Sequence, residues 1–128
     1  MNRYPSISVV MPVYNTGRYV GEAIQSILMQ KFTDFEFIII NDGSTDNSLS
    51  VISSFKDKRI KLINICANSG NYFARNKGYE IARGKYICAM DSDDVSTLNR
   101  LEIQFKYMED HPDVGLSGGG FRILGREE

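Results

Sequence analysis

The sequence predicts an α/β fold in which a mostly parallel β-sheet is flanked by helices. Short runs of β-branched residues alternate along the chain with longer segments in which apolar residues recur at helical spacing. The strand-like runs are apolar almost throughout, which is typical of strands buried on both faces of a parallel sheet. No internal repeat, low-complexity tract or linker interrupts this alternation, so we expect residues 1–128 to form a single domain.

The first half of the chain predicts three strands separated by two helices. The expected strands are residues 7–13, 35–40 and 60–65, and the expected helices are residues 18–30 and 47–55. The first helix is indicated by apolar residues that define one helical face, namely Val20, Ala23, Ile24, Ile27 and Leu28. The second helix follows Ser44, Thr45 and Asp46, residue types that commonly cap a helix amino terminus.

The second half predicts two further helices and two further strands. The expected helices are residues 71–83 and 98–110, and the expected strands are residues 85–90 and 114–117. Gly84 provides a stop for the first of these helices. The second helix carries an apolar face made by Leu98, Leu101, Phe105 and Met108. Three glycines at 118–120 then lead into the apolar residues 121–124.

Composition and charge favour an ordinary globular protein and disfavour nucleic acid as a partner. The 15 basic and 16 acidic residues leave a net charge of −1, and the basic residues are scattered. Neither a nucleic acid nor an anionic membrane therefore has an electrostatic reason to bind. No apolar run is long enough to span a membrane and no signal peptide is present, so we expect a cytoplasmic protein. Cys66 and Cys88 lie in apolar stretches, which predicts buried free thiols.

Polar and turn-forming residues collect directly after three of the predicted strands. These segments are residues 14–17, 41–46 and 91–94. Because parallel strands share a direction, their carboxyl ends meet at one edge of the sheet, where open α/β sheets bind ligands. The sequence therefore places Asp42, Asp91 and Asp93 on one rim. Tyr14, at the end of the first strand, lies beside them.

The triplet Asp91-Ser92-Asp93 predicts a metal site. In an extended segment, residues two apart point the same way, so two carboxylates converge and repel each other unless a cation lies between them. Carboxylate oxygens suit Mg²⁺ or Mn²⁺, which commonly bind one or two carboxylates together with water and substrate phosphates. The alternative interpretation is an acidic loop that only caps the following helix.

Two other polar segments each have a functional and a structural interpretation. Asp42 lies where it could accept hydrogen bonds from a ligand, although residues 41–46 could equally be a turn that leads into a helix. Residues 68–78 open a helix whose first N–H groups, with Arg75 and Lys77, could hold a diphosphate, whereas Arg75 could also be a surface charge. No Walker loop and no GxGxxG sequence occurs, which counts against a dinucleotide cofactor.

Five segments together resemble the family 2 glycosyltransferases. In chain order they are VVMPVYN (9–15), FIIINDGSTDNS (37–48), NSGNYFARNKG (68–78), ARGKYICAMDSDD (82–94) and HPDVGLSGGGFRI (111–123). Their order and spacing cover nearly the whole chain. The resemblance implies a Rossmann-like GT-A fold, of which this chain would be the nucleotide-sugar-binding portion, truncated on the carboxyl-terminal side.

The resemblance also implies roles for individual residues. Those that would contact the nucleotide, usually a uridine, are Pro12, Val13, Tyr14, Asp42, Arg75 and Asp91. Asp42 would accept a hydrogen bond from the base, and Asp93 together with Asp91 would bind Mn²⁺ or Mg²⁺. The metal would stabilise negative charge on the departing diphosphate, and an acceptor hydroxyl would attack the anomeric carbon with inversion.

The function implied is transfer of a sugar from a nucleoside diphosphate sugar, expected to be a UDP-sugar, in polysaccharide or glycoconjugate synthesis. The acceptor would be a carbohydrate or a lipid-linked molecule. For a lipid-linked acceptor, the full-length protein would work at the inner face of the membrane. The family's catalytic base lies downstream of the last matching strand, so we expect the base beyond residue 128 and assign none here.

One departure from the family pattern and two alternative functions follow from the sequence. Leu98 stands where the family usually has a proline, which predicts a less firmly fixed start of the last helix. The chain could instead be a nucleotide-sugar-binding module without catalysis. Residues 91–95 also fit DxDx[TV], a motif that resembles the nucleophile of haloacid-dehalogenase-type phosphatases, although that family carries it on its first strand.

Overall fold

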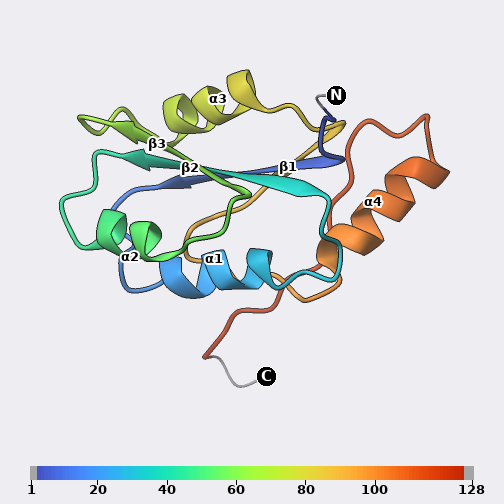
Figure 1. Cartoon of the computed structure of the whole chain (residues 1–128). Helices are drawn as coiled ribbons and strands as arrows, with labels where there is room; N and C mark the ends of the chain where they lie inside the picture. The colour runs from blue at the N-terminus through green and yellow to red at the C-terminus, as the bar shows by residue number, and fades with distance from the viewer. Residues whose placement is uncertain (1–2, 126–128) are drawn as a thin grey trace.

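The computed structural model describes residues 3–125 and shows a parallel four-stranded sheet between layers of helices (Figure 1). The strands are β1 (Ile7–Val13), β2 (Phe35–Asp42), β3 (Ile60–Ile65) and β4 (Tyr86–Ala89). The helices are α1 (Val20–Leu28), α2 (Ser48–Ser54), α3 (Asn71–Ile81) and α4 (Arg100–Asp110). Every strand pairing is parallel, so the predicted α/β class is confirmed.

The strand order β3-β2-β1-β4 reverses at β1. The chain steps from β1 to β2 and then to β3 in one direction, and afterwards crosses back to add β4 on the other side of β1. α1 and α2 make the first two crossovers and lie on one face, whereas α3 makes the return crossover and covers the opposite face (Figure 1). A reversal of this kind leaves a crevice at the carboxyl edge of the sheet, because the neighbouring loops turn toward opposite faces.

The larger part of the core lies between the sheet and α1. Met11 of β1 and Phe37 of β2 are fully buried there against Ile24 and Ile27 of α1. α4 lies at the side of the domain and adds Leu101 to the same cluster (Figure 1). β1 and β2 are buried along their whole length on both faces, which explains the uninterrupted apolar runs at residues 9–13 of β1 and 37–40 of β2.

On the opposite face, α3 packs closely against the sheet because small residues stand at the contact. A Cβ atom on Gly78 would overlap Cγ1 of Val10 and would lie 2.8 Å from Cδ1 of Ile40. Ala74, one turn earlier in α3, is fully buried in the same cluster. These small residues bring the amino-terminal turn of α3 close to the carboxyl ends of β1 and β2, where the site forms.

Several element boundaries differ from prediction by a few residues. β1 and β3 have the predicted bounds, whereas β2 extends by two residues to Asp42. The helix predicted at 18–30 spans Val20–Leu28, and the helix predicted at 98–110 begins at Arg100. Leu98 therefore lies outside α4, and its side chain is exposed rather than part of the predicted apolar face.

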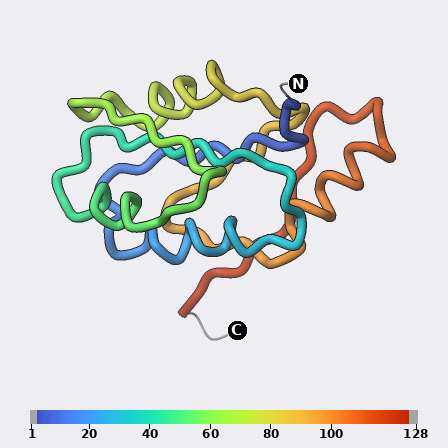
Figure 2. The backbone as a smooth tube through the Cα atoms, viewed as in Figure 1, coloured from blue at the N-terminus to red at the C-terminus, as the bar shows by residue number. Residues whose placement is uncertain are grey.

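The predicted strand at residues 114–117 is wrong. In the part of the chain that the structure describes, neither this segment nor residues 121–124 has strand geometry or a ladder partner. Leu116 is 89% exposed and Phe121 is 91% exposed. Apolar composition alone predicted the strand, but a strand also needs a neighbour, and this segment runs from α4 across to the α1 side of the domain (Figure 2).

The prediction of two buried thiols is wrong for Cys66, which is exposed in the loop after β3. Cys88 is half-buried in β4, and its burial raises the pKa of the thiol, which makes it less reactive. Both thiols are free. Among the residues that the structure describes, no helix is both long and apolar enough to cross a membrane.

Candidate functional site

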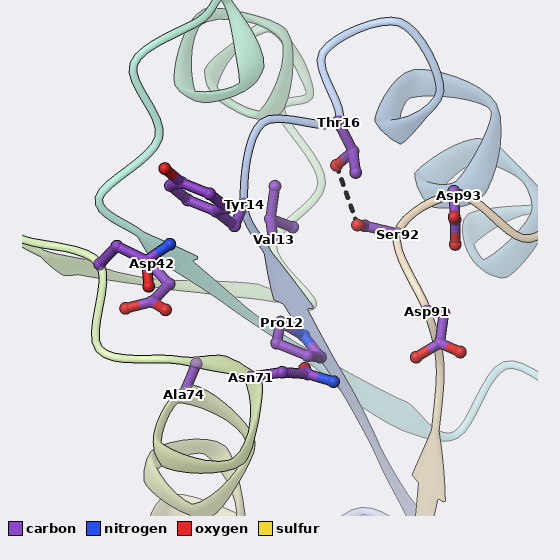
Figure 3. A pocket seen from close by; sticks show the side chains of 11 residues that line it. Pro12, Val13, Tyr14, Thr16, Asp42, Asn71, Ala74, Asp91, Ser92 and Asp93 are labelled. Carbon is purple, nitrogen blue, oxygen red and sulfur yellow. Dashed lines mark hydrogen bonds between the residues drawn. The ribbon is translucent and has the colours of Figure 1, made fainter.

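A cavity of about 370 Å³ opens at the carboxyl edge of the sheet, between the loop after β1 and the segment after β4 (Figure 3). It is lined by Pro12, Val13, Tyr14, Thr16, Asp42, Asn68, Asn71, Ala74, Asp91, Ser92 and Asp93. The structure thus brings together six of the seven residues predicted to contact a nucleotide or a metal. The seventh, Arg75, reaches the cavity wall through a contact with Asp91.

The cavity begins where β1 loses β4 as its neighbour. The register between these strands ends at Val10 and Ala89, and the Val10 carbonyl accepts a 3.0 Å hydrogen bond from the Met90 N–H. Two residues further along β1, the backbone nitrogen of Pro12 faces the same side, beyond the end of β4. Because proline has no N–H, β1 leaves no unpaired donor at this point. Pro12 can therefore line the cavity without an energetic cost to the sheet.

Asn15 joins the loops that follow β1 and β2. Its φ angle of 50° is in the left-handed region, which asparagine tolerates better than most residues. In this conformation Asn15 Oδ1 accepts hydrogen bonds from the N–H groups of Thr45 at 2.8 Å and Asp46 at 3.3 Å. The Asn15 N–H donates to Ser44 Oγ at 3.1 Å. The two loops thus form one connected wall, which carries Tyr14 at the cavity (Figure 3).

Asp42 joins the end of β2 to the loop that precedes α3. Its carboxylate oxygens accept hydrogen bonds from the backbone N–H groups of Ser69 at 2.9 Å and Gly70 at 3.0 Å. The close approach of this loop requires glycine at position 43, where a Cβ atom would lie 2.6 Å from the backbone nitrogen of Asn68. Asp42 is only 2% exposed, yet it lines the cavity. Each carboxylate oxygen has more than one lone pair, so Asp42 can still accept a hydrogen bond from a ligand.

Asp91, Ser92 and Asp93 form a turn, so the extended geometry predicted for them is wrong. The Asp94 N–H donates to the Asp91 carbonyl at 3.2 Å. Ser92 is 6% exposed, and its hydroxyl lies 2.9 Å from Thr16 Oγ1, which holds the turn against the loop after β1 (Figure 3). Asp91 and Asp93 are exposed and both line the cavity. The two carboxylates therefore lie at the same cavity because the turn brings them there, and not because alternate residues of a strand point the same way.

A concentration of negative charge marks this turn. Partial burial raises the pKa of Asp94, and the charges of Asp93 and Asp91 raise it further, while Arg100 opposes the rise. Within residues 3–125, no group of three or more His, Cys, Asp or Glu side chains is arranged to hold a metal ion. A cation bound at this turn would therefore need oxygen ligands from elsewhere, such as water or a substrate phosphate.

Arg75 and Lys77, the two cations predicted to lie near a diphosphate, have different surroundings. Arg75 Nη2 lies 2.7 Å from Asp91 Oδ1, so its charge is at the cavity wall. Lys77 pairs with Glu80 on the same helix at 3.4 Å, and it does not line the cavity. The structure thus associates only Arg75 with the acidic turn.

A buried glutamine fixes the segment after the acidic turn. Gln30 Nε2 donates to the Thr97 carbonyl at 2.6 Å, and Gln30 Oε1 accepts from the Leu101 N–H at 3.1 Å. The Lys31 N–H adds a bond of 3.0 Å to the Leu98 carbonyl. The expectation of a loosely fixed start of α4 is therefore wrong. Sequence reasoning missed Gln30 because its partners lie 67 and 71 residues away along the chain.

The fold and the position of the cavity define an open α/β domain of the nucleotide-binding type. The chain belongs to glycosyl transferase family 2, because the model of this family matches residues 8–127. The predicted family and its GT-A fold are thereby confirmed.

Individual relatives agree with this assignment. A glycosyltransferase of Haemophilus influenzae, itself uncharacterized, is 45% identical over 106 residues, which are 81% of this chain and 42% of the relative. Residues 1–349 of S. aureus TarS, in complex with UDP-GlcNAc, match with a TM-score of 0.80 at 29% identity, over 84% of this chain and 32% of that fragment.

The mannosyltransferase PcManGT from Pyrobaculum calidifontis, in complex with GDP-Man and Mn²⁺, has a TM-score of 0.75 at 21% identity, over 84% of this chain and 33% of its own. This last likeness is one of fold. The chain spans less than half the length of each of these proteins.

Proposed function

We propose that this chain binds the nucleotide-sugar donor, a UDP-sugar, of a metal-dependent glycosyltransferase. The observation that carries the proposal is the cavity at the strand reversal, which Asp42 borders on one side and the acidic turn on the other (Figure 3). Its volume of about 370 Å³ is within the range of about 300–1,000 Å³ that is typical of small-molecule sites. TarS is 29% identical to this chain, and its structure in complex with UDP-GlcNAc supports uracil as the base.

The two ends of the cavity offer different chemistry to the two ends of a nucleoside diphosphate. At one end the ring of Tyr14, 46% exposed, presents a surface on which a base can stack, and Asp42 can accept a hydrogen bond from a base N–H. At the other end lie Asp91 and Asp93 of the acidic turn, with Arg75 beside them through its contact with Asp91. We therefore orient the base toward Tyr14 and Asp42 and the diphosphate toward Arg75 and the acidic turn.

The donors at the acidic turn fit Mn²⁺ or Mg²⁺. Asp91 and Asp93 supply hard carboxylate oxygens at the cavity, and these cations commonly bind one or two carboxylates and complete their shell with water and phosphate oxygens. A bound cation would supply neutralisation of the negative charge that develops on the departing diphosphate. Asp93 would be its main protein ligand, because Asp91 also pairs with Arg75.

The reaction we propose is an inverting displacement at the anomeric carbon of the donor sugar. The bond from this carbon to the diphosphate oxygen breaks as the bond to the acceptor oxygen forms, and the electron pair leaves with UDP. The acceptor proton passes to a carboxylate base, which we do not assign to any residue of this chain. The chain's own residues would bind and orient the donor. We place the reaction in the cytoplasm, where reducing conditions keep an exposed thiol such as Cys66 free.

Family membership favours sugar transfer over the phosphatase alternative. The phosphatases carry the motif on their first strand, whereas Asp91 follows β4, which is the last strand in chain order among the residues that the structure describes. A binding module without catalysis would share the same cavity. Acceptor-dependent release of UDP by the longer protein would separate the module from the enzyme.

The proposal is tested by calorimetric titration of UDP into the purified chain, first with Mn²⁺ and then with EDTA. The same titrations are made on Asp93→Asn, which removes a charge at the cavity, and on Asp113→Asn, which removes an exposed charge outside it. We expect Mn²⁺ to strengthen UDP binding in the parent chain and in Asp113→Asn but not in Asp93→Asn. If GDP binds and UDP does not, the base assignment is wrong. If Mn²⁺ has no effect, the proposed metal dependence is wrong.

A further inference from the structure

The loop that carries Asp91 and Asp93 is closed at its base by one side chain. Arg100, the first residue of α4, donates from Nη2 to the carbonyl of Ala89 at 2.9 Å, and Ala89 is the last residue of β4. Arg100 Nη1 donates to Ser96 Oγ at 3.0 Å. Residues 90–95 therefore lie between two partners of the same guanidinium. Arg100 itself does not line the cavity.

The atoms around this closure are themselves fixed. Ser96 is 9% exposed, and its N–H donates to Ser26 Oγ of α1 at 3.1 Å. Met90 is 3% exposed, and its sulfur lies within 3.4 Å of both Ser96 Oγ and Arg100 Nη1. On the other side, Arg100 Nε donates to Gln104 Oε1 at 3.2 Å, which orients the guanidinium from α4. The closure thus connects the loop to α1 and α4 and does not depend on the cavity residues.

We propose that Arg100 is a positioning residue, whose guanidinium closes the acidic loop and so sets where Asp91 and Asp93 present their carboxylates to a cation. A metal site tolerates only small errors in the positions of its ligands. The contacts that hold the two ends of the loop therefore affect metal affinity as well as the carboxylates themselves do. The metal-related part of this inference rests on the proposed function, whereas the closure of the loop is independent of it.

The geometry requires arginine rather than a positive charge in general. The planar guanidinium presents several N–H donors in fixed directions, so it can bind the Ala89 carbonyl and Ser96 Oγ, at the two ends of the loop, at the same time. A lysine ammonium would keep the charge near Asp94 but could not keep the fork. Arg100→Lys therefore separates a positioning role from a purely electrostatic one, and Ser96→Ala removes one partner while leaving the arginine in place.

The first experiment measures amide hydrogen exchange at residues 90–96 in the metal-free chain. We expect Arg100→Lys and Ser96→Ala to speed exchange there about tenfold. Each variant removes a hydrogen bond that the loop must break to open, and the loss of one such bond to a charged group raises the population of the open state by about this factor. Lys106→Met is the matched control, because Lys106 is an exposed cation on the same helix that pairs with Asp110. Unchanged exchange in both loop variants would overturn the closure, whatever the chain binds.

The second experiment compares UDP affinity with Mn²⁺ and with EDTA in the same proteins. We expect the strengthening by Mn²⁺ to fall about 10- to 100-fold in Arg100→Lys, while affinity in EDTA stays within about twofold of the parent, as for a residue that orients a metal ligand. An undiminished Mn²⁺ effect, or an equal loss with and without Mn²⁺, would overturn the positioning role. If Mn²⁺ has no effect even in the parent chain, the proposed function fails and with it the metal step, and the exchange result alone decides the closure.

Discussion

The guanidinium of Arg75 lies 2.7 Å from the carboxylate of Asp91, so a residue of α3 neutralises one of the two acidic side chains that line the cavity after β4. The side chain of Arg75 is 18% exposed, whereas that of Asp91 is 58% exposed. The arginine is therefore held by its surroundings, and the carboxylate remains accessible from the cavity. A cation that enters must share Asp91 with this charge or displace it.

Removing the positive charge of Arg75 should strengthen metal binding in the absence of nucleotide. A partly exposed pair of this kind contributes about 0.2–1 kcal/mol, so we expect Arg75→Met to lower the Kd for Mn²⁺ by about 1.5- to 5-fold. UDP affinity in EDTA should fall in the same variant, because a cation near the diphosphate is lost. Both affinities are measured by calorimetry, with Lys77→Met as the control from the same helix. Weaker Mn²⁺ binding in Arg75→Met would show that Arg75 supports the turn instead of competing for it.

The hydrogen bond between Thr16 and Ser92 should appear as a coupling energy in a double-mutant cycle. The two hydroxyl oxygens are 2.9 Å apart, although the residues are 76 positions apart in the sequence, and both side chains are at least partly buried. We expect Thr16→Val and Ser92→Ala each to lower the free energy of unfolding by about 0.5–1.5 kcal/mol, and the double variant to lose no more than the worse single variant. Urea unfolding measures all three, with Thr33→Val as an exposed control. Losses that simply add would contradict a direct interaction.

β1 and β3 have the predicted bounds, although only β1 is buried along its whole length. In β1, burial on both faces of the sheet leaves a nearly uninterrupted apolar run, which is a clear signal in the sequence. The segment at 114–117 is apolar as well, but no strand lies beside it in the described part of the chain, and composition carries no information about a partner. The sequence pattern therefore predicts which segments can be strands better than which ones pair.

The candidate site was predictable in outline for a similar reason. Asp42, Asp91 and Asp93 share one edge because parallel strands end there, and strand ends can be located from the sequence. The turn at 91–93 and the contact between Arg75 and Asp91 could not be predicted from spacing, since tertiary contacts determine both. Gln30 and Arg100 were missed altogether for the same reason. Neither residue lines the cavity or belongs to a motif.

A buried carboxylate at the opposite end of the sheet should make stability depend on pH. Glu36 is 5% exposed, and burial alone would raise its pKa. Hydrogen bonds from Lys61, from the Ser8 hydroxyl and from the Arg83 N–H outweigh this effect and hold the pKa below its ordinary value of 4.5. The unfolded chain therefore takes up a proton on Glu36 at a higher pH than the folded chain does. This contribution to stability is complete above about pH 4.5 and is lost as the pH falls toward the folded pKa.

Glu36→Gln tests this contribution. We expect the variant to lose about 1–3 kcal/mol of unfolding free energy at pH 7, because Lys61 loses its charged partner and one acceptor oxygen is replaced by a donor. The difference from the parent chain should shrink as the pH falls below 4.5, where Glu36 takes up a proton in the unfolded chain while it is still ionised in the folded chain. Urea unfolding at a series of pH values measures both effects, with the exposed Glu80→Gln as the control. A difference that is constant with pH would exclude ionised Glu36 as the cause.

Adding a methyl group at Gly78 should disrupt the packing of α3 against the sheet. In an exposed helix position, replacement of glycine by alanine stabilises a protein by about 1 kcal/mol. At Gly78 the new methyl group would overlap Cγ1 of Val10 and lie 2.8 Å from Cδ1 of Ile40, so we expect Gly78→Ala to destabilise the chain by about 1–3 kcal/mol instead. Gly115→Ala is the control, because no atom lies within 4 Å of a Cβ placed there, and its effect should stay within about 0.5 kcal/mol.

The same substitution should also weaken nucleotide binding. The methyl group can be accommodated only if α3 moves away from the sheet, and Asn71 and Ala74 at the start of α3 line the cavity. We therefore expect Gly78→Ala to lower UDP affinity both with and without Mn²⁺, since Arg75 of α3, which pairs with Asp91, would move together with Asn71 and Ala74. Urea unfolding and calorimetry on the same preparations measure the two effects. Destabilisation with unchanged UDP affinity would show that the start of α3 does not hold the nucleotide.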